Sequence, residues 1–188
     1  MKAELITPRL VTIKLTQEKT DPDYGSCLWA RFMLDLDRYS MQIMSDCGSY
    51  AYAWCPTPDS ESFLHLVGRM ESDYLLGKIS DQTVVDTEAT YKAVIRYLEE
   101  LKEYKEIDEE NSYDLDDILS DCNSYTQRDC MESLMRTLDA TSYFQNYDYE
   151  DLAYCVQTQY PANARKVGEI FEKYIKPLAR KMDKEGTV

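Results

Sequence analysis

Histidine, glycine and long apolar runs are scarce in this sequence, and each scarcity excludes a class of function. The 188 residues include one histidine, His65, and six glycines. No glycines fall in a G-x-G-x-x-G or P-loop spacing, so a phosphate-cradling loop is not expected. A serine or cysteine nucleophile would have to use His65 as its base, and the residues around it indicate no triad. We therefore expect no enzyme of these kinds and assign no catalytic residue.

Membrane segments are also missing. No stretch approaches the roughly 20 consecutive apolar residues that a transmembrane helix needs. The first eight residues, MKAELITP, lack the apolar centre of a secretory signal. The sequence therefore predicts a soluble, intracellular protein.

Cysteine pairs at metal-binding spacing are absent as well. The six cysteines are Cys27, Cys47, Cys55, Cys122, Cys130 and Cys155. None forms a C-x-x-C pair, so the usual zinc patterns are missing and we expect reduced, metal-free thiols and no cofactor. Cys122 and Cys130 would lie about 12 Å apart along one helix, too far for a disulfide. Cys47 and Cys55 flank a predicted strand and could approach a cysteine of another strand.

Negative charge, by contrast, is abundant and concentrated between Glu106 and Asp151. This segment holds 14 carboxylates and only two basic residues, whereas the whole chain has a net charge of −14. Residues 152–188 carry seven basic and four acidic residues. Such asymmetry indicates a charged partner, and a pI near 4.5 argues against direct binding to nucleic acid, whose phosphates would be repelled.

The apolar pattern predicts an α+β fold, with an N-terminal antiparallel sheet of about four strands followed by a helical C-terminal half. Alternation of apolar and polar residues predicts strands at 9–15, 28–34, 39–46 and 50–55. Helical spacing then predicts helices at about 57–70, 72–79 (capped by Ser72), 86–105 and from Pro161 onward. We expect one domain, 1–188, with a sheet-containing lobe at 1–80 and a helical lobe with an acidic face at 81–188.

Two of these predictions concern which side chains face inward. In the fourth strand Tyr50, Tyr52 and Trp54 share one face and small residues share the other, so a helix is expected to pack closely on the small side. The aromatic row then forms core or faces a partner. The last helix is predicted to bury six residues and to kink at Pro177. The six are Val167, Ile170, Phe171, Tyr174, Ile175 and Leu178.

Within the acidic segment the spacing is helical, which distinguishes it from a disordered tail. Leu115, Ile118, Leu119 and Cys122 repeat at intervals of three or four, with aspartates on or near the opposite face. A second helix is expected over 126–139. An EF-hand loop beginning at Asp108 is excluded, because its sixth residue is Tyr113 instead of glycine and its twelfth is Leu119 instead of glutamate.

We predict that a helical acidic face binds a protein partner by imitating a row of nucleic-acid phosphates. The predicted partner-binding residues are Asp108, Glu109, Glu110, Asp114, Asp116, Asp117 and Asp121. Two other interpretations of these carboxylates remain: a surface that only keeps the protein soluble, and a metal-dependent enzyme site at 114–121.

A resemblance points the same way. The run GSYAYAW at 48–54, Phe63-Leu64, and SDYLLGKI at 72–79 resemble a pattern in small accessory proteins of bacteriophages and prophages. Such proteins are similar in size and acidity to anti-CRISPR and anti-restriction inhibitors, which often block the nucleic-acid channel of a nuclease. The resemblance implies an inhibitor acting in the cytoplasm of the bacterial host, and it carries no binding residue over to this chain.

Two functions therefore follow from the sequence. The first is an anti-defence inhibitor whose protein partner has a basic nucleic-acid-binding channel. The alternative is a non-enzymatic phage structural or regulatory protein that associates with itself, as a homodimer, through the aromatic face of Tyr50, Tyr52 and Trp54.

Overall fold

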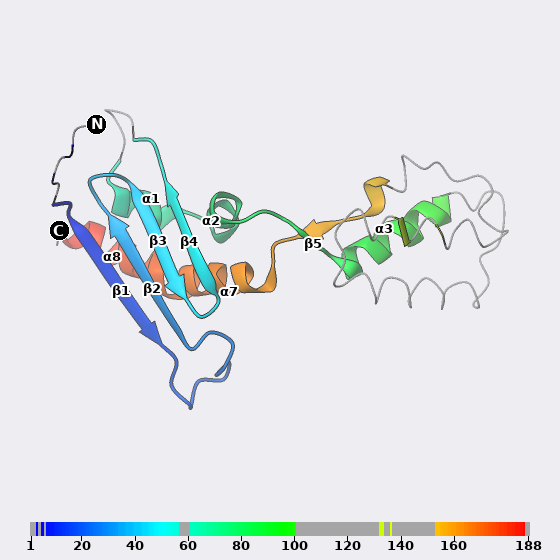
Figure 1. Ribbon diagram of the computed structural model, residues 1–188, viewed down its shortest axis with the longest axis horizontal. Helices are drawn as coiled ribbons and strands as arrows, with labels where there is room; N and C mark the ends of the chain where they lie inside the picture. The colour runs from blue at the N-terminus through cyan, green and yellow to red at the C-terminus, as the bar shows by residue number, and fades with distance from the viewer. Residues whose placement is uncertain are drawn as a thin grey trace. The chain divides into compact units, whose positions relative to one another are not determined.

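The chain folds into two compact units in the computed structural model (Figure 1). Unit 1 comprises Met1–Asp81 and Ala162–Val188, and unit 2 comprises Gln82–Pro161. The residues that the structure describes are 3, 5, 7–56, 61–100, 132, 133, 136 and 153–186. The last segment of the chain thus returns to the unit that contains the sheet, an arrangement that the order of elements in the sequence does not indicate.

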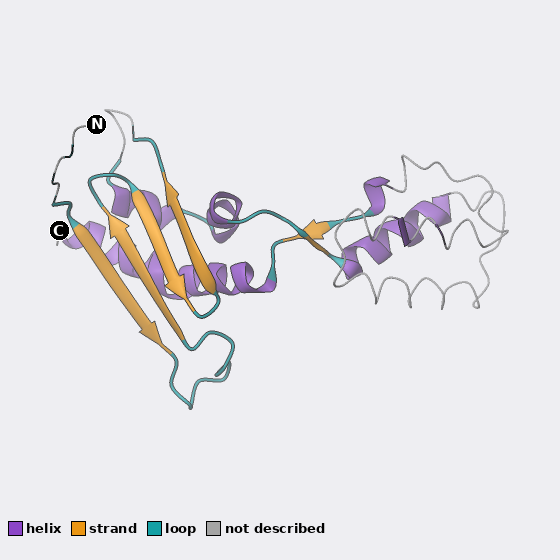
Figure 2. Cartoon of the chain, in the orientation of Figure 1, coloured by secondary structure: helices purple, strands orange, loops and turns teal. Residues whose placement is uncertain are grey.

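Unit 1 contains a four-stranded antiparallel meander in the order β1-β2-β3-β4, which confirms the predicted α+β class (Figure 2). The strands are β1 (Leu10–Thr16), β2 (Trp29–Asp35), β3 (Ser40–Ser45) and β4 (Gly48–Ala53). Their bounds lie within about two residues of the predicted ones, because period-2 alternation is a local signal that each strand carries by itself.

Strand register gathers the apolar residues on one face of this sheet. Ile13 pairs with Phe32, Phe32 with Ile43, and Ile43 with Tyr50. Phe32 and Ile43, in the two central strands, are buried at 0% and 1% exposure. Side chains alternate between the two faces of a strand, so these four paired residues share one face of the sheet. The residues that precede and follow each of them in its strand lie on the opposite, more exposed face.

Two tight reversals hold that register. Between β2 and β3, Asp35 Oδ1 accepts hydrogen bonds from the backbone N–H groups of Asp37 (3.1 Å) and Arg38 (3.0 Å). Between β3 and β4, Ser45 pairs with Gly48, which leaves a two-residue loop. Gly48 has φ 122°, and a Cβ there would lie 2.9 Å from the hydroxyl oxygen of Tyr50, so only glycine fits without strain.

The helices of unit 1 cover the aromatic side of β4, and the prediction that a helix packs on its small side was wrong. Ala51 and Ala53 are exposed, whereas Tyr50 and Trp54 pack against the core. The Trp54 ring lies 5.5 Å from that of Phe63, centroid to centroid. Aromatic rings offer far more apolar area than alanine, so burying them against the helices is the more favourable choice.

Helix α1 (Phe63–Arg69) and helix α2 (Ser72–Ile79) follow the sheet as predicted. Ser62 caps α1 by accepting the backbone N–H of His65 at 3.0 Å. The predicted cap of α2 was wrong: Glu71 occupies the N-cap position without a side-chain hydrogen bond, and Ser72 is the first helical residue. Gly68 allows α1 to approach the last helix, since a Cβ there would lie 2.9 Å from Arg180 Cγ.

The last helical segment has three parts: α7 (Ala162–Ile170), the π-helical turn η3 (Phe171–Ile175) and α8 (Lys176–Glu185). Val167, Phe171 and Ile175 are buried as predicted, but Tyr174 is 42% and Leu178 39% exposed, so their predicted burial was wrong. The wider π-turn ends two residues before Pro177, whose nitrogen cannot donate a helical hydrogen bond. The turn interrupts the regular spacing and so changes which residues of α8 face the core. Ala179 is buried there instead.

Unit 2 is described in part. A two-residue antiparallel pair, β5 (Val84–Val85) and β6 (Thr158–Gln159), joins its two ends; the sequence did not predict either strand. Helix α3 (Thr87–Glu100) begins after Asp86, whose Oδ1 accepts the backbone N–H of Ala89 at 2.9 Å and so caps the helix. Across the described part of the chain, none of the helices is sufficiently long and apolar to span a membrane.

Candidate functional site

The seven predicted partner-binding residues, Asp108 to Asp121, lie outside the described residues, as do Leu115, Ile118, Leu119 and Cys122. Of the second predicted acidic helix, at 126–139, the structure describes Glu132, Ser133 and Arg136, all helical.

The charged residues are divided unequally between the two units. Unit 1 carries 15 basic and 16 acidic residues, whereas unit 2 carries 6 basic and 19 acidic residues. Nearly the whole net charge of the protein therefore belongs to one compact unit.

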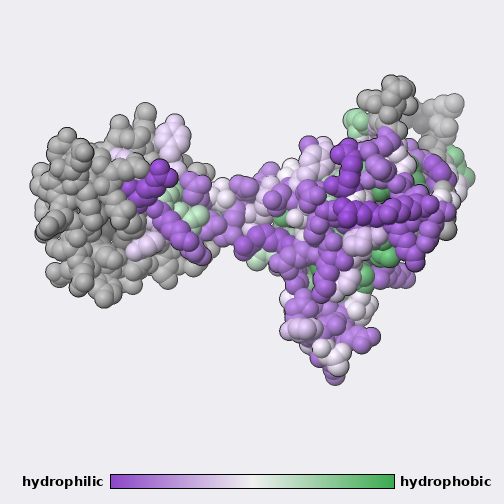
Figure 3. All heavy atoms as spheres, turned by 180° about the vertical axis from the view of Figure 1, so that it is seen from behind, coloured by the Kyte–Doolittle hydropathy of each residue, from purple (hydrophilic) through white to green (hydrophobic). Residues whose placement is uncertain are grey.

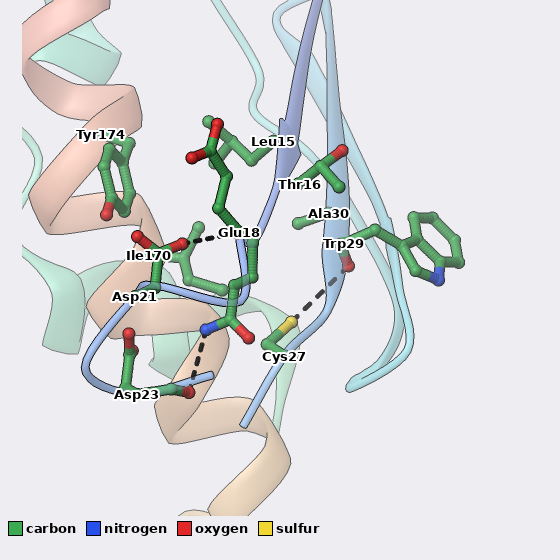
Figure 4. Close-up of a pocket in the computed structure, with 11 residues that line it drawn as sticks. Leu15, Thr16, Glu18, Asp21, Asp23, Cys27, Trp29, Ala30, Ile170 and Tyr174 are labelled. Carbon is green, nitrogen blue, oxygen red and sulfur yellow. Dashed lines mark hydrogen bonds between the residues drawn. The ribbon is translucent and has the colours of Figure 1, made fainter. Parts of the chain in front are cut away.

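Within unit 1, a pocket of about 260 Å³ lies between the β1–β2 loop, residues 17–28, and the last helical segment (Figure 4). Leu15 and Ala30 line it from the sheet, and Ile170 and Tyr174 line it from the helices. The loop adds three carboxylates, Glu18, Asp21 and Asp23.

Hydrogen bonds within the loop fix its shape. Gln17 Oε1 accepts the backbone N–H of Gly25 at 2.9 Å, and its Nε2 donates to the backbone carbonyl of Asp23 at 3.1 Å. Asp21 Oδ2 accepts the backbone N–H of Glu18 at 2.7 Å. The side chains of Gln17 and Asp21 therefore satisfy backbone groups of the loop.

Asp23 ties the loop to α7 through Lys166, whose Nζ lies 2.8 Å from Asp23 Oδ2 and 3.0 Å from Glu169 Oε2. The hydrogen bond from Lys166 lowers the pKa of Asp23, and the bond to Asp23, followed by that to Glu169, raises the pKa of Lys166. This is an ion pair that anchors the loop, and its geometry does not resemble two carboxylates sharing a proton.

Cys27, at one wall of the pocket, belongs to a cluster with Asp46 and Cys47 from the β3–β4 turn. Their three candidate ligand atoms lie within 4.8 Å of one another. The Cys27 thiol lies 3.2 Å from Asp46 Oδ1, and Cys47 donates to the carbonyl of Ser26 at 3.2 Å. Leu28 N–H donates to Asp46 Oδ2 at 2.8 Å. Both cysteines are buried, whereas Asp46 is exposed.

The surroundings shift the pKa of Cys27 and the pKa of Asp46 in opposite directions. Burial, reinforced by hydrogen bonds with Cys47 and Asp46, raises the pKa of Cys27 strongly, so its thiol is protonated at neutral pH. For Asp46, burial acts to raise the pKa, but hydrogen bonds from Cys27 and from the backbone of Leu28 and Trp29 outweigh it and lower the pKa. A neutral donor thus faces an ionised acceptor.

The sequence indicated that Cys47 could approach a cysteine of another strand, and Cys27, which lies just before β2, is that cysteine. It did not identify Cys27 or Asp46 as the neighbours of Cys47, because 19 residues separate Cys27 from Cys47. The signal that could have found it is the hairpin register. Ala30 pairs with Ser45, so the residues just before β2 come close to those just after β3. Of the other cysteines, Cys55 is exposed and Cys155 is buried, while Cys122 and Cys130 lie outside the described residues.

The histidine is part of a second polar cluster, which ties α1 to α8. Ser62 Oγ donates to Asp183 Oδ1 at 2.6 Å, and His65 Nδ1 lies 2.9 Å from Asp183 Oδ2. His65 Nε2 faces Glu61 at 3.4 Å. The hydroxyl and the imidazole are thus bound to carboxylates instead of to each other, which is not the geometry of an activated serine. Hydrogen bonds from Ser62 and His65 lower the pKa of Asp183.

Together these features define an α+β protein with one nearly neutral unit and one strongly acidic unit. The chain belongs to a phage protein family: the family model, described as a phage family, matches residues 6–181. No curated protein and no solved structure matches the chain.

Proposed function

We propose that this phage-family protein is a non-enzymatic anti-defence inhibitor that acts in the host cytoplasm. Its acidic surface, formed by Asp108, Glu109, Glu110 and the aspartates at 114, 116, 117 and 121, binds a nucleic-acid-handling effector such as a CRISPR nuclease. The surface occupies the basic channel that otherwise holds nucleic acid.

The observation that carries the proposal is the partition of charge between the units. Basic and acidic residues nearly balance in unit 1, while acidic residues outnumber basic ones by 19 to 6 in unit 2. A charge that served solubility alone could be spread over the whole surface. Its concentration in one unit suits a partner of opposite charge, and the membership of a phage family supports the phage setting.

The acidic segment is densely charged, as this role requires. Duplex DNA presents about one negative charge per 1.7 Å of axis. Residues 106–151 place 14 carboxylates in 46 positions of the chain. Steering between opposite fields accelerates association. A single exposed ion pair contributes on the order of 0–1 kcal/mol, but several close pairs in a partly dehydrated interface can contribute several kcal/mol.

The self-association alternative required the aromatic face of β4 to be available. Trp54 instead packs on Phe63 of α1, and its Nε1 donates to the Tyr74 hydroxyl of α2 at 3.3 Å. Lys78 lies 5.5 Å from the centre of the Tyr52 ring. The row is therefore covered by the helices of its own unit, which favours the acidic surface over the aromatic one.

The test is a quadruple variant, Asp114→Asn, Asp116→Asn, Asp117→Asn and Asp121→Asn. We expect it to lose capture of a nucleic-acid-handling protein from host lysate and to lose competition with duplex DNA for that protein. Raising salt from about 0.1 M to 1 M should weaken wild-type capture in the same way, because the Debye length falls from about 10 Å to 3 Å.

A matched control removes the same number of charges from unit 1. Glu18→Gln, Asp73→Asn, Asp81→Asn and Glu185→Gln all change exposed side chains. This variant should capture the partner as the wild type does. The proposal is contradicted if the quadruple variant of unit 2 captures the partner and competes with DNA as well as the wild type does. If both variants lose capture equally, binding depends on the total charge of the protein and not on the acidic surface, which also contradicts the proposal.

A further inference from the structure

We propose that Cys27, Asp46 and Cys47 form a binding site for one thiophilic divalent cation, with zinc as the ion that suits this donor set. The bound ion would join the start of β2 to the β3–β4 turn. The inference is independent of the acidic surface, because all three residues belong to unit 1.

The donor atoms already lie close to the positions that zinc requires. Zinc takes cysteine sulfur at about 2.3 Å and carboxylate oxygen at about 2.0–2.2 Å in a tetrahedral arrangement. Such bond lengths place two sulfur ligands about 3.8 Å apart. Here the three donor atoms lie within 4.8 Å of one another, with Cys27 Sγ 3.2 Å from Asp46 Oδ1. Shifts of about 1 Å or less would bring them to those distances.

The carboxylate is held in place by the backbone. Leu28 N–H donates to Asp46 Oδ2 at 2.8 Å, and Trp29 N–H approaches Oδ1 at 3.5 Å. Hydrogen bonds of this type orient the ligands of metal sites and tune their affinity. Asp46 therefore need not reorganise when it accepts an ion.

The cluster also has a route to solvent. Cys27 lines the pocket of about 260 Å³, and Figure 4 shows its sulfur beside the strand carbonyl of Trp29, to which it is hydrogen bonded at 3.6 Å. A cation can enter through this pocket or past the exposed carboxylate. A water molecule can supply the fourth ligand, as in zinc sites with three protein ligands.

Binding is a proton exchange without oxidation or reduction. The cation forms two bonds to sulfur and one to Asp46, and the two thiols release one proton each to the solvent. Asp46 and the Trp29 carbonyl, which both face the one Cys27 thiol proton, lose that donor, and the Ser26 carbonyl loses the donor of Cys47. Such S–H donors are weak. The proposal departs from the metal-free thiols that the cysteine spacing predicts, since the fold and not the spacing brings these cysteines together.

The test uses the whole, reduced chain after treatment with a chelator, and Cd²⁺ as a probe for thiolate binding. We expect one equivalent of Cd²⁺ to bind with the ultraviolet absorption of a cadmium–thiolate bond and to be displaced by Zn²⁺. Cys27→Ser and Cys47→Ser should each weaken binding at least tenfold, and Asp46→Asn should weaken it less. Cys55→Ser, which changes an exposed thiol of the same unit, should bind as the wild type does.

A second measurement needs no variant and so does not depend on the variants folding. Zn²⁺ should protect Cys27 and Cys47 of the wild-type chain from alkylation in mild denaturant, as read by mass spectrometry, while Cys55 stays reactive. The proposal is overturned if no stoichiometric binding occurs at micromolar Zn²⁺, or if protection falls on Cys122 and Cys130 instead. It is also overturned if the double variant at 27 and 47 binds the ion unchanged.

Discussion

Unit 1 and unit 2 differ in what their residues are used for. Unit 1 balances its charges and joins a sheet to helices from both ends of the chain through a shared core that includes Phe32, Phe63 and Phe171, all at 2% exposure or less. Unit 2 carries an excess of 13 acidic residues. We propose that the two units have different roles, with unit 1 as the scaffold and unit 2 as the source of charge for a partner.

The polar contacts of unit 1 fit that interpretation. Lys176 is buried, and its Nζ lies 2.6 Å from Glu172 Oε1 and 3.0 Å from Glu71 Oε2, which ties α8 to the start of α2. Seen from the back of the view in Figure 1, the surface of unit 1 is mostly hydrophilic (Figure 3). Several of its charges join neighbouring elements, whereas the carboxylates of unit 2 greatly exceed the basic residues available there.

The largest expected effect is in the core of unit 1. Phe171→Ala removes a fully buried ring and should cost about 3–5 kcal/mol of unfolding free energy, as for other large-to-small core changes. Both tryptophans, Trp29 and Trp54, belong to unit 1, so their fluorescence in a urea titration reports on this unit. Tyr174→Ala, at an exposed position three residues further on, should cost much less; equal costs would contradict the described packing of this segment.

Much of unit 1 could be predicted from the sequence, because its signals are local. Alternation located the four strands, and helical spacing located α1 and α2. On the inward face of the last helix, the burial of Val167, Phe171 and Ile175 was predicted correctly. The burial of Tyr174 and Leu178 was predicted wrongly because apolar spacing assumes a regular α-helix, and the π-turn at 171–175 interrupts that regularity.

The candidate sites show the same limit. Charge is a property of composition, so the acidic segment could be found without a structure. The cluster of Cys27, Asp46 and Cys47 depends on strand register, which joins residues far apart in the sequence, and no spacing rule for cysteines covers it. The small side of β4 was misassigned for a related reason: alternation separates two faces but does not say which one the helices cover.

A smaller effect is expected from acid on the β3–β4 turn of unit 1. The pKa of Asp46 is lowered in the folded state, so its contribution is present above the unfolded pKa of about 3.9 and is lost as the pH falls through the lower folded value. Asp46→Asn should therefore lose stability at pH 7 and show a shallower loss below about pH 4. Because Asp46 is exposed, we expect about 1 kcal/mol or less. The measurement is the unfolding free energy from urea titrations at several pH values between 2 and 7. If it changes with pH equally in the wild type and in the variant, this assignment is contradicted.

The smallest expected effect tests whether the two units are independent. The quadruple variant of Asp114, Asp116, Asp117 and Asp121 should shift the tryptophan-monitored unfolding of unit 1 by no more than about 0.5 kcal/mol, because substitutions away from a core or a buried network rarely do more. Relief of like-charge repulsion should, if anything, raise the stability of unit 2. Far-ultraviolet circular dichroism in the same titration includes both units and should reveal that gain. If the unfolding free energy that the tryptophan fluorescence reports falls by more than about 1 kcal/mol, unit 1 depends on the acidic residues for its stability. The division between scaffold and charged surface would then fail, even if partner binding were lost as expected.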